Sequence, residues 1–146
     1  MNKEIRLIYL DFKLIIMEIE DSKEIYKAAL LYITSNNRKY DKAEIIVSLK
    51  LISETFSNIF DYEKPIIKLL KDNELISSYY LLISLIINSI VDKIWILLDI
   101  LENNKIPNNN TLTKIESIFN LTDHLQKNIE YIFICIEREY YKNGKK

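Results

Sequence analysis

The chain has 146 residues, of which 49% are hydrophobic and 28% charged, and its formal net charge is −1. These values are typical of one globular domain, which we place over residues 1–146, and they exclude an intrinsically disordered protein. Because basic and acidic residues are balanced in both halves of the chain, the sequence also lacks the positive excess of a nucleic-acid-binding protein.

Turn-forming residues are scarce: the only glycine is Gly144, and the only prolines are Pro65 and Pro107. Glycine takes positive φ without steric cost, so tight hairpins, left-handed helix caps and phosphate-binding loops depend on it. The sequence therefore predicts an all-α fold whose long helices are joined by Asn- and Asp-rich turns. The abundance of Ile, Asn, Lys and Tyr is also typical of an AT-rich genome.

The first predicted helix covers residues 5–19, where isoleucines and Phe12 recur at three- and four-residue steps. An alternation of polar and apolar residues leaves a strand as the alternative for residues 5–16. A capping box at residues 21–24 predicts that a second helix begins there, and we expect it to end at residues 34–37. Further apolar residues widen the apolar face of the first helix, so we expect this helix to be buried nearly all round. These residues are Leu7, Leu10, Leu14 and Met17.

Three more helices follow, the last of them in the longest apolar stretch. A capping box at residues 41–44 predicts the start of the third helix, and Pro65 marks a short fourth helix that ends near residues 72–73. From about 74 to 102 we predict a long central helix. A helix that is apolar on most of its circumference is expected to be surrounded by others. The side opposite its main apolar face also carries Leu81, Leu82, Leu85, Trp95 and Ile96.

The end of the chain follows a polar loop at residues 103–110. A capping box at residues 113–116 predicts the start of the last helical segment, and a second box at residues 123–126 leaves open a break near residues 120–122. The complete prediction is a single compact helical bundle of five to seven helices around the long buried central helix.

The central helix raises the question of a membrane span. Over residues 79–97, the Ile, Leu and Val side chains favour insertion by about −3 to −6 kcal/mol, whereas Asp92 and Lys93 oppose it by about +5 to +7 kcal/mol. We therefore expect no membrane span. The N-terminal residues also lack the small-residue cleavage site of a secretory signal, so we expect a soluble, intracellular protein of the cytoplasm.

Residues suited to catalysis or metal binding are few. His124 is the only histidine, and we expect Asp123 to cap a helix and leave His124 exposed. The single cysteine, Cys135, excludes an internal disulfide and is predicted to be buried. Asp92 and Asp99, seven residues apart on the central helix, are the one candidate pair for an enzyme with a carboxylate site. The sequence otherwise predicts no catalytic constellation, no cofactor and no metal, and therefore a protein that is not an enzyme.

Tyrosine is the residue type that bears most on function. The chain has ten tyrosines, and protein interfaces are enriched in tyrosine and tryptophan. The predicted partner is another protein or a second copy of the chain, and the predicted function is a protein–protein interaction module, an inhibitor or immunity-type factor. The alternative is a structural subunit of a larger helical complex, or a homo-oligomer, in which a partner buries extra apolar surface on the first and central helices. The residues predicted to form the interaction surface are Tyr79, Tyr80, Trp95, Tyr140 and Tyr141.

A Pro-Asn-Asn-Asn-Thr-Leu run at residues 107–112 separates the predicted central helix from the final helices. In this layout, in size, in helix count and in its buried central helix, the chain resembles the poxviral Bcl-2-like proteins. The resemblance implies an all-α fold. It also implies a viral antagonist of host apoptosis or inflammatory signalling, acting through helix-lined surfaces.

Overall fold

The computed structural model describes residues 3–35 and 39–144, with side chains described as far as residue 142, and these ranges contain no strand. The all-α prediction is confirmed, whereas the predicted number of five to seven helices is wrong, because four long helices form the bundle. They are α1 (Lys3–Ser35), α2 (Lys42–Asn58), α4 (Ile76–Glu102) and α6 (Ile118–Gly144). The connections contain a 3₁₀ turn, η1 (Ile59–Tyr62), and two short helices, α3 (Glu63–Leu69) and α5 (Asn109–Glu116).

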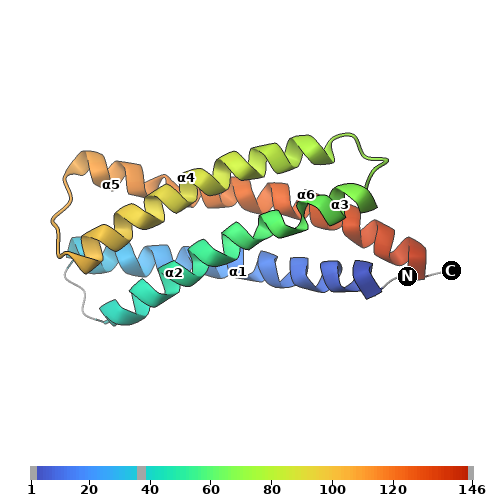
Figure 1. Cartoon of the computed structure of the whole chain (residues 1–146). Helices are drawn as coiled ribbons and strands as arrows, with labels where there is room; N and C mark the ends of the chain where they lie inside the picture. The colour runs from blue at the N-terminus through green and yellow to red at the C-terminus, as the bar shows by residue number, and fades with distance from the viewer. Residues whose placement is uncertain (1–2, 36–38, 145–146) are drawn as a thin grey trace.

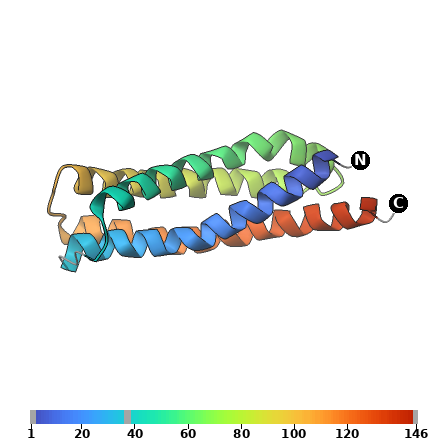
Figure 2. The ribbon, with the colours of Figure 1, turned by 90° about the horizontal axis from the view of Figure 1, so that it is seen from below.

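The four long helices alternate in direction along the bundle (Figure 1). α1 packs against α2 and α6, and α4 packs against the same two helices, so α1 and α4 lie at opposite corners of the bundle. Seen from below, α1 runs beside α6 along the bundle (Figure 2). Both chain ends lie at the same end of the bundle, near α3 (Figure 1). In this up-and-down order each helix is joined to a neighbour, which is the arrangement that short connections favour.

The core is built mainly from isoleucine side chains of all four long helices. Isoleucine is β-branched and has a lower helix propensity than leucine or alanine, so its packing must supply the stability of these helices. Cys135 is buried, as predicted from its apolar neighbours. The largest fully buried side chains are aromatic: Tyr26, Tyr80, Phe12 and Phe56.

α4 is a corner helix and is not enclosed by other helices. The predicted bounds of about 74–102 are close to the observed ones. The prediction that α4 is surrounded is wrong, because packing on α2 and α6 covers its inner side only. Among the described residues, α4 is the one helix that is long and apolar enough to cross a membrane. Of its most apolar 18-residue segment, 39% is buried inside the bundle. This is weak support for a span, since core helices of soluble proteins have the same composition. The exposed apolar residues of its outer side are Leu81, Leu82, Leu85 and Trp95.

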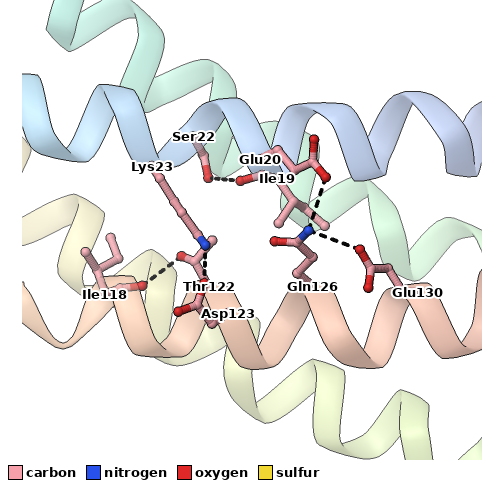
Figure 3. A network of polar contacts seen from close by, with 9 residues as sticks. All are labelled: Ile19, Glu20, Ser22, Lys23, Ile118, Thr122, Asp123, Gln126 and Glu130. Carbon is pink, nitrogen blue, oxygen red and sulfur yellow. Dashed lines mark hydrogen bonds and ion pairs between the residues drawn. The ribbon is translucent and has the colours of Figure 1, made fainter.

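α1 runs without interruption across the predicted helix start at residues 21–24. The hydroxyl of Ser22 donates to the carbonyl oxygen of Ile19 at 2.7 Å and caps no new helix. Lys23 forms an ion pair with Asp123 of α6 (Figure 3). The two helices predicted for this part of the chain are therefore one, because the polar residues of the box bond within α1 and across to α6.

The first part of α1 confirms the helical interpretation of residues 5–16 and excludes the strand alternative. α1 ends at Ser35, inside the predicted end at residues 34–37, of which residues 36 and 37 lie outside the described residues. The expectation that this part is buried nearly all round is wrong, because only the side toward the bundle is covered. The exposed residues are Leu7, Leu10, Leu14 and Met17.

α6 likewise continues through residues 120–122, where the sequence allows a break. The buried hydroxyl of Thr122 donates to the carbonyl oxygen of Ile118 at 2.7 Å, one turn earlier in the helix (Figure 3). Asp123 lies inside α6 and faces Lys23 of α1, so the prediction that Asp123 caps a helix is wrong.

Polar side chains also join α1 and α6 further along the same contact (Figure 3). The amide of Gln126 donates to Glu20 of α1 at 3.2 Å and to Glu130 of its own helix at 3.0 Å. Together with the pair between Lys23 and Asp123, these bonds lie at the rim of the apolar contact. Such partly exposed pairs contribute about 0–1 kcal/mol each, so the buried apolar side chains provide most of the stability of this contact.

The predicted use of Asp and Asn at helix starts is confirmed at two helices. The Asp41 carboxylate accepts from the backbone N–H of Ala43 at 2.8 Å at the start of α2. The Asn108 side chain accepts from the N–H of Thr111 at 2.8 Å at the start of α5. α5 therefore begins before the predicted box at residues 113–116, because Asn108 provides the cap.

Asparagine also replaces glycine at the end of α4. Asn104 has φ of 51° and is the one non-glycine residue with positive φ in the described chain. The backbone N–H of Lys105 donates to the carbonyl oxygen of Ile100 at 3.1 Å. This bond and the left-handed residue before it are the features of a Schellman motif, which ends the helix without glycine.

Candidate interaction surfaces

Tyr79 and Tyr80 belong to the contact between helices and do not form an open surface. The side chain of Tyr80 is only 1% exposed. Tyr79 is half-buried, and its ring stacks on that of Tyr131 of α6 with 4.2 Å between the centroids. The predicted pair therefore contributes to packing of α4 against the rest of the bundle.

The other three predicted surface residues lie in two separate places. Trp95 is 57% exposed on the outer side of α4. Tyr140 and Tyr141 lie near the end of α6, where Tyr140 stacks on Tyr9 of α1 at 4.6 Å and meets Tyr141 edge-on at 5.4 Å. The structure thus places the five predicted residues in the core, on the side of α4 and at the end of the bundle.

The outer side of α4 carries an apolar surface that we call the α4 leucine patch, formed by Leu81, Leu82 and Leu85. These side chains are between 45% and 66% exposed. They lie within the charge-free segment at residues 75–91, so no ionised side chain of α4 itself stands among them. Apolar clusters of this kind mark interaction sites when they are contiguous.

The outer side of α1 carries a second apolar surface, which we call the α1 stripe. Its side chains are between 43% and 61% exposed. They recur at steps of three, four and three residues, so they lie in one line along the helix. This line faces away from the buried side of α1. The members of the stripe are Leu7, Leu10, Leu14 and Met17.

Two hollows lie near the α1 stripe. A groove of about 330 Å³ runs between α1 and α2, with Ile25, Leu51 and Phe56 in its walls and Glu18 and Asp21 on its α1 side. A larger hollow of about 670 Å³ lies between the start of α1 and α3. Neither is lined by histidine or cysteine, so neither brings together a nucleophile and an imidazole base.

The carboxylates proposed as an enzyme site are not a buried pair. Asp92 and Asp99 are both exposed on the outer side of α4. Asp99 accepts hydrogen bonds from Lys105 and from Asn103, each at 2.7 Å. These two bonds hold the pKa of the Asp99 carboxyl below its usual range, with Lys105 as the larger cause. Asp99 therefore joins the last turn of α4 to the residues that follow it, which is a structural role.

The remaining reactive residue types are also accounted for by the fold. His124 is exposed, as predicted, although it lies inside α6 and not in a first turn. Cys135 is buried, and its sulfur accepts from the Asn73 amide at 3.5 Å. In the described chain no group of three or more His, Cys, Asp or Glu residues is arranged to hold a metal ion.

Two buried tyrosine hydroxyls, those of Tyr26 and Tyr80, make no hydrogen bond to the described residues. Burial raises the pKa of Tyr26 to about 12, and the neighbouring hydroxyls of Ser22 and Thr122 partly offset this rise. Burial also raises the pKa of Tyr80 well above its ordinary value, and the charge of Glu63 acts in the same direction. Both phenols are therefore neutral at physiological pH and lie in the core, away from both hollows.

The sequence predicted extra apolar surface on the first and central helices, but it did not show which residues are exposed, because these residues look like core residues. One signal distinguishes them: isoleucines fill much of the buried side of α4, whereas leucines occupy the exposed patch. Comparisons of the chain with protein-family models, with curated proteins and with solved structures found no match.

Proposed function

We propose that the protein is a non-enzymatic protein-binding module that holds a partner on the α4 leucine patch. The observation that carries this proposal is the exposure of Leu81, Leu82 and Leu85 on a helix whose opposite side already fills the core. Three neighbouring leucines in water leave apolar area that a partner can bury, at about 25 cal/mol per Å². An inhibitor or immunity-type factor of the cytoplasm is the class of protein that we propose.

The chemistry of the patch indicates the kind of partner. Because residues 75–91 contain no charge, α4 offers no ion pair near its leucines. A matching partner surface is therefore apolar at its centre and uncharged at its rim, such as one side of an amphipathic helix. Trp95 lies further along the outer side of α4, and it can extend the contact, since tryptophan is frequent among energetically dominant interface residues.

The test combines crosslinking with a matched pair of variants. A photoreactive side chain at Leu82 should capture a discrete partner in cells of the source organism, and replacing Leu81 and Leu85 by Ser should reduce that capture at least tenfold. The control replaces Val47 and Leu51 on α2, which are as exposed as the patch residues. Equal capture by both variants would contradict the proposal, as would substrate turnover by the purified protein that depends on Asp92 and Asp99.

A structural subunit of a larger helical complex is the second candidate function. The observation that favours it is the presence of two apolar surfaces, the α4 leucine patch and the α1 stripe, on opposite corners of the bundle. One chain could then bridge two neighbours. A viral Bcl-2-like antagonist is the less favoured alternative, because that resemblance rested in part on a buried central helix, whereas α4 occupies a corner of the bundle.

A further inference from the structure

We propose that the α1 stripe pairs with the α1 stripe of a second copy of this chain, with the two helices parallel and in register. The stripe has the spacing of the a and d positions of a heptad repeat, which is the spacing that two-stranded coiled coils bury. Leu7 and Leu14 take the a positions, and Leu10 and Met17 take the d positions. All four are exposed and face away from the bundle, so two bundles can meet corner to corner.

The charges on either side of the stripe select the parallel orientation. In the same register Arg6 and Lys13 take g positions, and Asp11 and Glu18 take e positions. In a parallel pair each g residue lies beside the e residue that follows five positions later on the other helix. Arg6 then meets Asp11 of the second copy, and Lys13 meets Glu18 of the second copy. Two-fold symmetry repeats both contacts, and all of them are attractive.

The antiparallel arrangement is disfavoured by the same residues. In an antiparallel pair g positions face g positions and e positions face e positions. If the stripe is kept in contact, Lys13 faces Lys13 of the second copy and Asp11 faces Asp11. Like charges at these positions are a known means of excluding an orientation. Charge therefore distinguishes a parallel second copy from an antiparallel one.

The structure holds the flanking residues beside the stripe. The Oδ2 atom of Asp11 accepts the hydroxyl of Tyr62 at 2.7 Å, which orients the carboxylate and leaves Oδ1 for Arg6 of the second copy. The amine of Lys13 lies 5.0 Å from the centroid of the Tyr9 ring and can turn from there toward the second copy. α1 is already folded over 33 residues, so pairing costs no helix formation.

The length of the seam sets the strength of the pairing. The next a position is Asp21 and the next d position is Glu24, and their like charges end the apolar seam after two heptads. An interface of this length buries less than the ~1,600 Å² of a standard protein–protein interface. We therefore expect a reversible dimer with a Kd in the micromolar range, roughly 10–100 μM, which is typical of such small interfaces.

Sedimentation equilibrium over a range of protein concentrations tests the pairing. The wild-type chain should dimerise, and Leu14→Lys should be monomeric while keeping its helical circular dichroism. Lys13→Glu should weaken the dimer at least tenfold, and adding Glu18→Lys to it should restore the dimer. A wild-type chain that stays monomeric at ~1 mM would overturn the proposal, as would a dimer that Leu14→Lys does not change. Replacing Leu82 by Lys should leave the dimer intact.

Disulfide trapping tests the orientation. In a Cys135→Ala background, Leu10→Cys should form a crosslinked dimer under mild oxidation, because a d position faces itself in a parallel in-register pair. In an antiparallel pair residue 10 faces Leu14, so failure of the crosslink in a chain that dimerises would overturn the parallel arrangement. The outcome is independent of the proposed function, which rests on α4, because partner capture at Leu82 can succeed or fail whether or not α1 pairs.

Discussion

The buried hydroxyl of Tyr80 gives a prediction in which removing a polar atom stabilises the protein. The Tyr80 side chain is 1% exposed, and its hydroxyl oxygen makes no hydrogen bond to the described residues. A buried polar group without a partner costs about 1–3 kcal/mol. Tyr80→Phe removes that cost and leaves only an oxygen-sized gap, so we expect a gain of about 1 kcal/mol in the free energy of unfolding.

Tyr62→Phe is the matched control for this change. The hydroxyl of Tyr62 donates to the Asp11 carboxylate at 2.7 Å, and a hydrogen bond to a charged acceptor at a partly exposed site contributes about 1 kcal/mol. The same chemical substitution should therefore destabilise the protein at residue 62 and stabilise it at residue 80. The two variants should differ by about 2 kcal/mol in the free energy of unfolding.

Urea denaturation followed by circular dichroism measures both variants. The dependence of the free energy on urea concentration should be unchanged, because neither substitution alters the area exposed on unfolding. For a chain of this length a gain of about 1 kcal/mol corresponds to a rise of about 3 °C in Tm. A Tyr80→Phe protein that is less stable than wild type would show that the hydroxyl is hydrogen-bonded in solution, and would refute the reasoning.

Two further predictions concern the orientation of α4 and the response to alkaline pH. Ile94 is fully buried, so Ile94→Ala should lower the free energy of unfolding by about 2–5 kcal/mol. The neighbouring residue Trp95 is exposed, so Trp95→Ala should lower it by less than about 1 kcal/mol. Similar decreases in the urea midpoint of the two variants would contradict the placement of α4. Burial raises the pKa of Tyr26 to about 12, and the hydrogen bond to the Asp11 carboxylate raises that of Tyr62 to about 12, from ordinary values of 10. Because the folded chain holds these protons more tightly, their contribution to stability is complete below about pH 10 and is lost as the pH rises to about 12. The urea midpoint should fall over this interval, and a fall of the same size in Tyr62→Phe would count against the role of Tyr62.

Several features of the fold were predictable because they depend on contacts within a few residues. The Asp41 cap bonds an amide two residues away. The end of α4 is set by the left-handed residue Asn104 and the polar loop after it. Such local bonds form in the same way whatever the surrounding structure is, and this is why the bounds of α4 were close to those predicted.

The errors in the helix count arose where the same local sequence pattern can either start a helix or lie inside one. The residues at 21–24 and at 123–126 both match a capping box, yet both lie inside long helices. In the fold Ser22 bonds the preceding turn of its own helix, and Lys23 pairs with Asp123 across the contact between α1 and α6. That pair joins residues a hundred positions apart, so the local sequence could not show that these side chains had partners elsewhere.

The candidate interaction surfaces were misjudged for a related reason. Leu14 and Leu81 have the same hydrophobicity as leucines of the core, and only the neighbouring helices determine which side of α1 or α4 is covered. Tyr80 shows the opposite error, since it was expected on the surface and lies in the core. Composition and spacing determine how much apolar area a helix carries, but they do not determine which part of that area its neighbours bury.

By itself, then, the sequence determined that the chain is helical, that Asp and Asn make its turns, and where α4 begins and ends. These properties follow from steric limits on φ and from hydrogen bonds that span three or four residues. Only the tertiary structure decided that there are four long helices, that α4 stands at a corner, and that leucines of α1 and α4 face solvent. The reason is that burial is a property of pairs of helices, and each pair is formed by residues far apart in the chain.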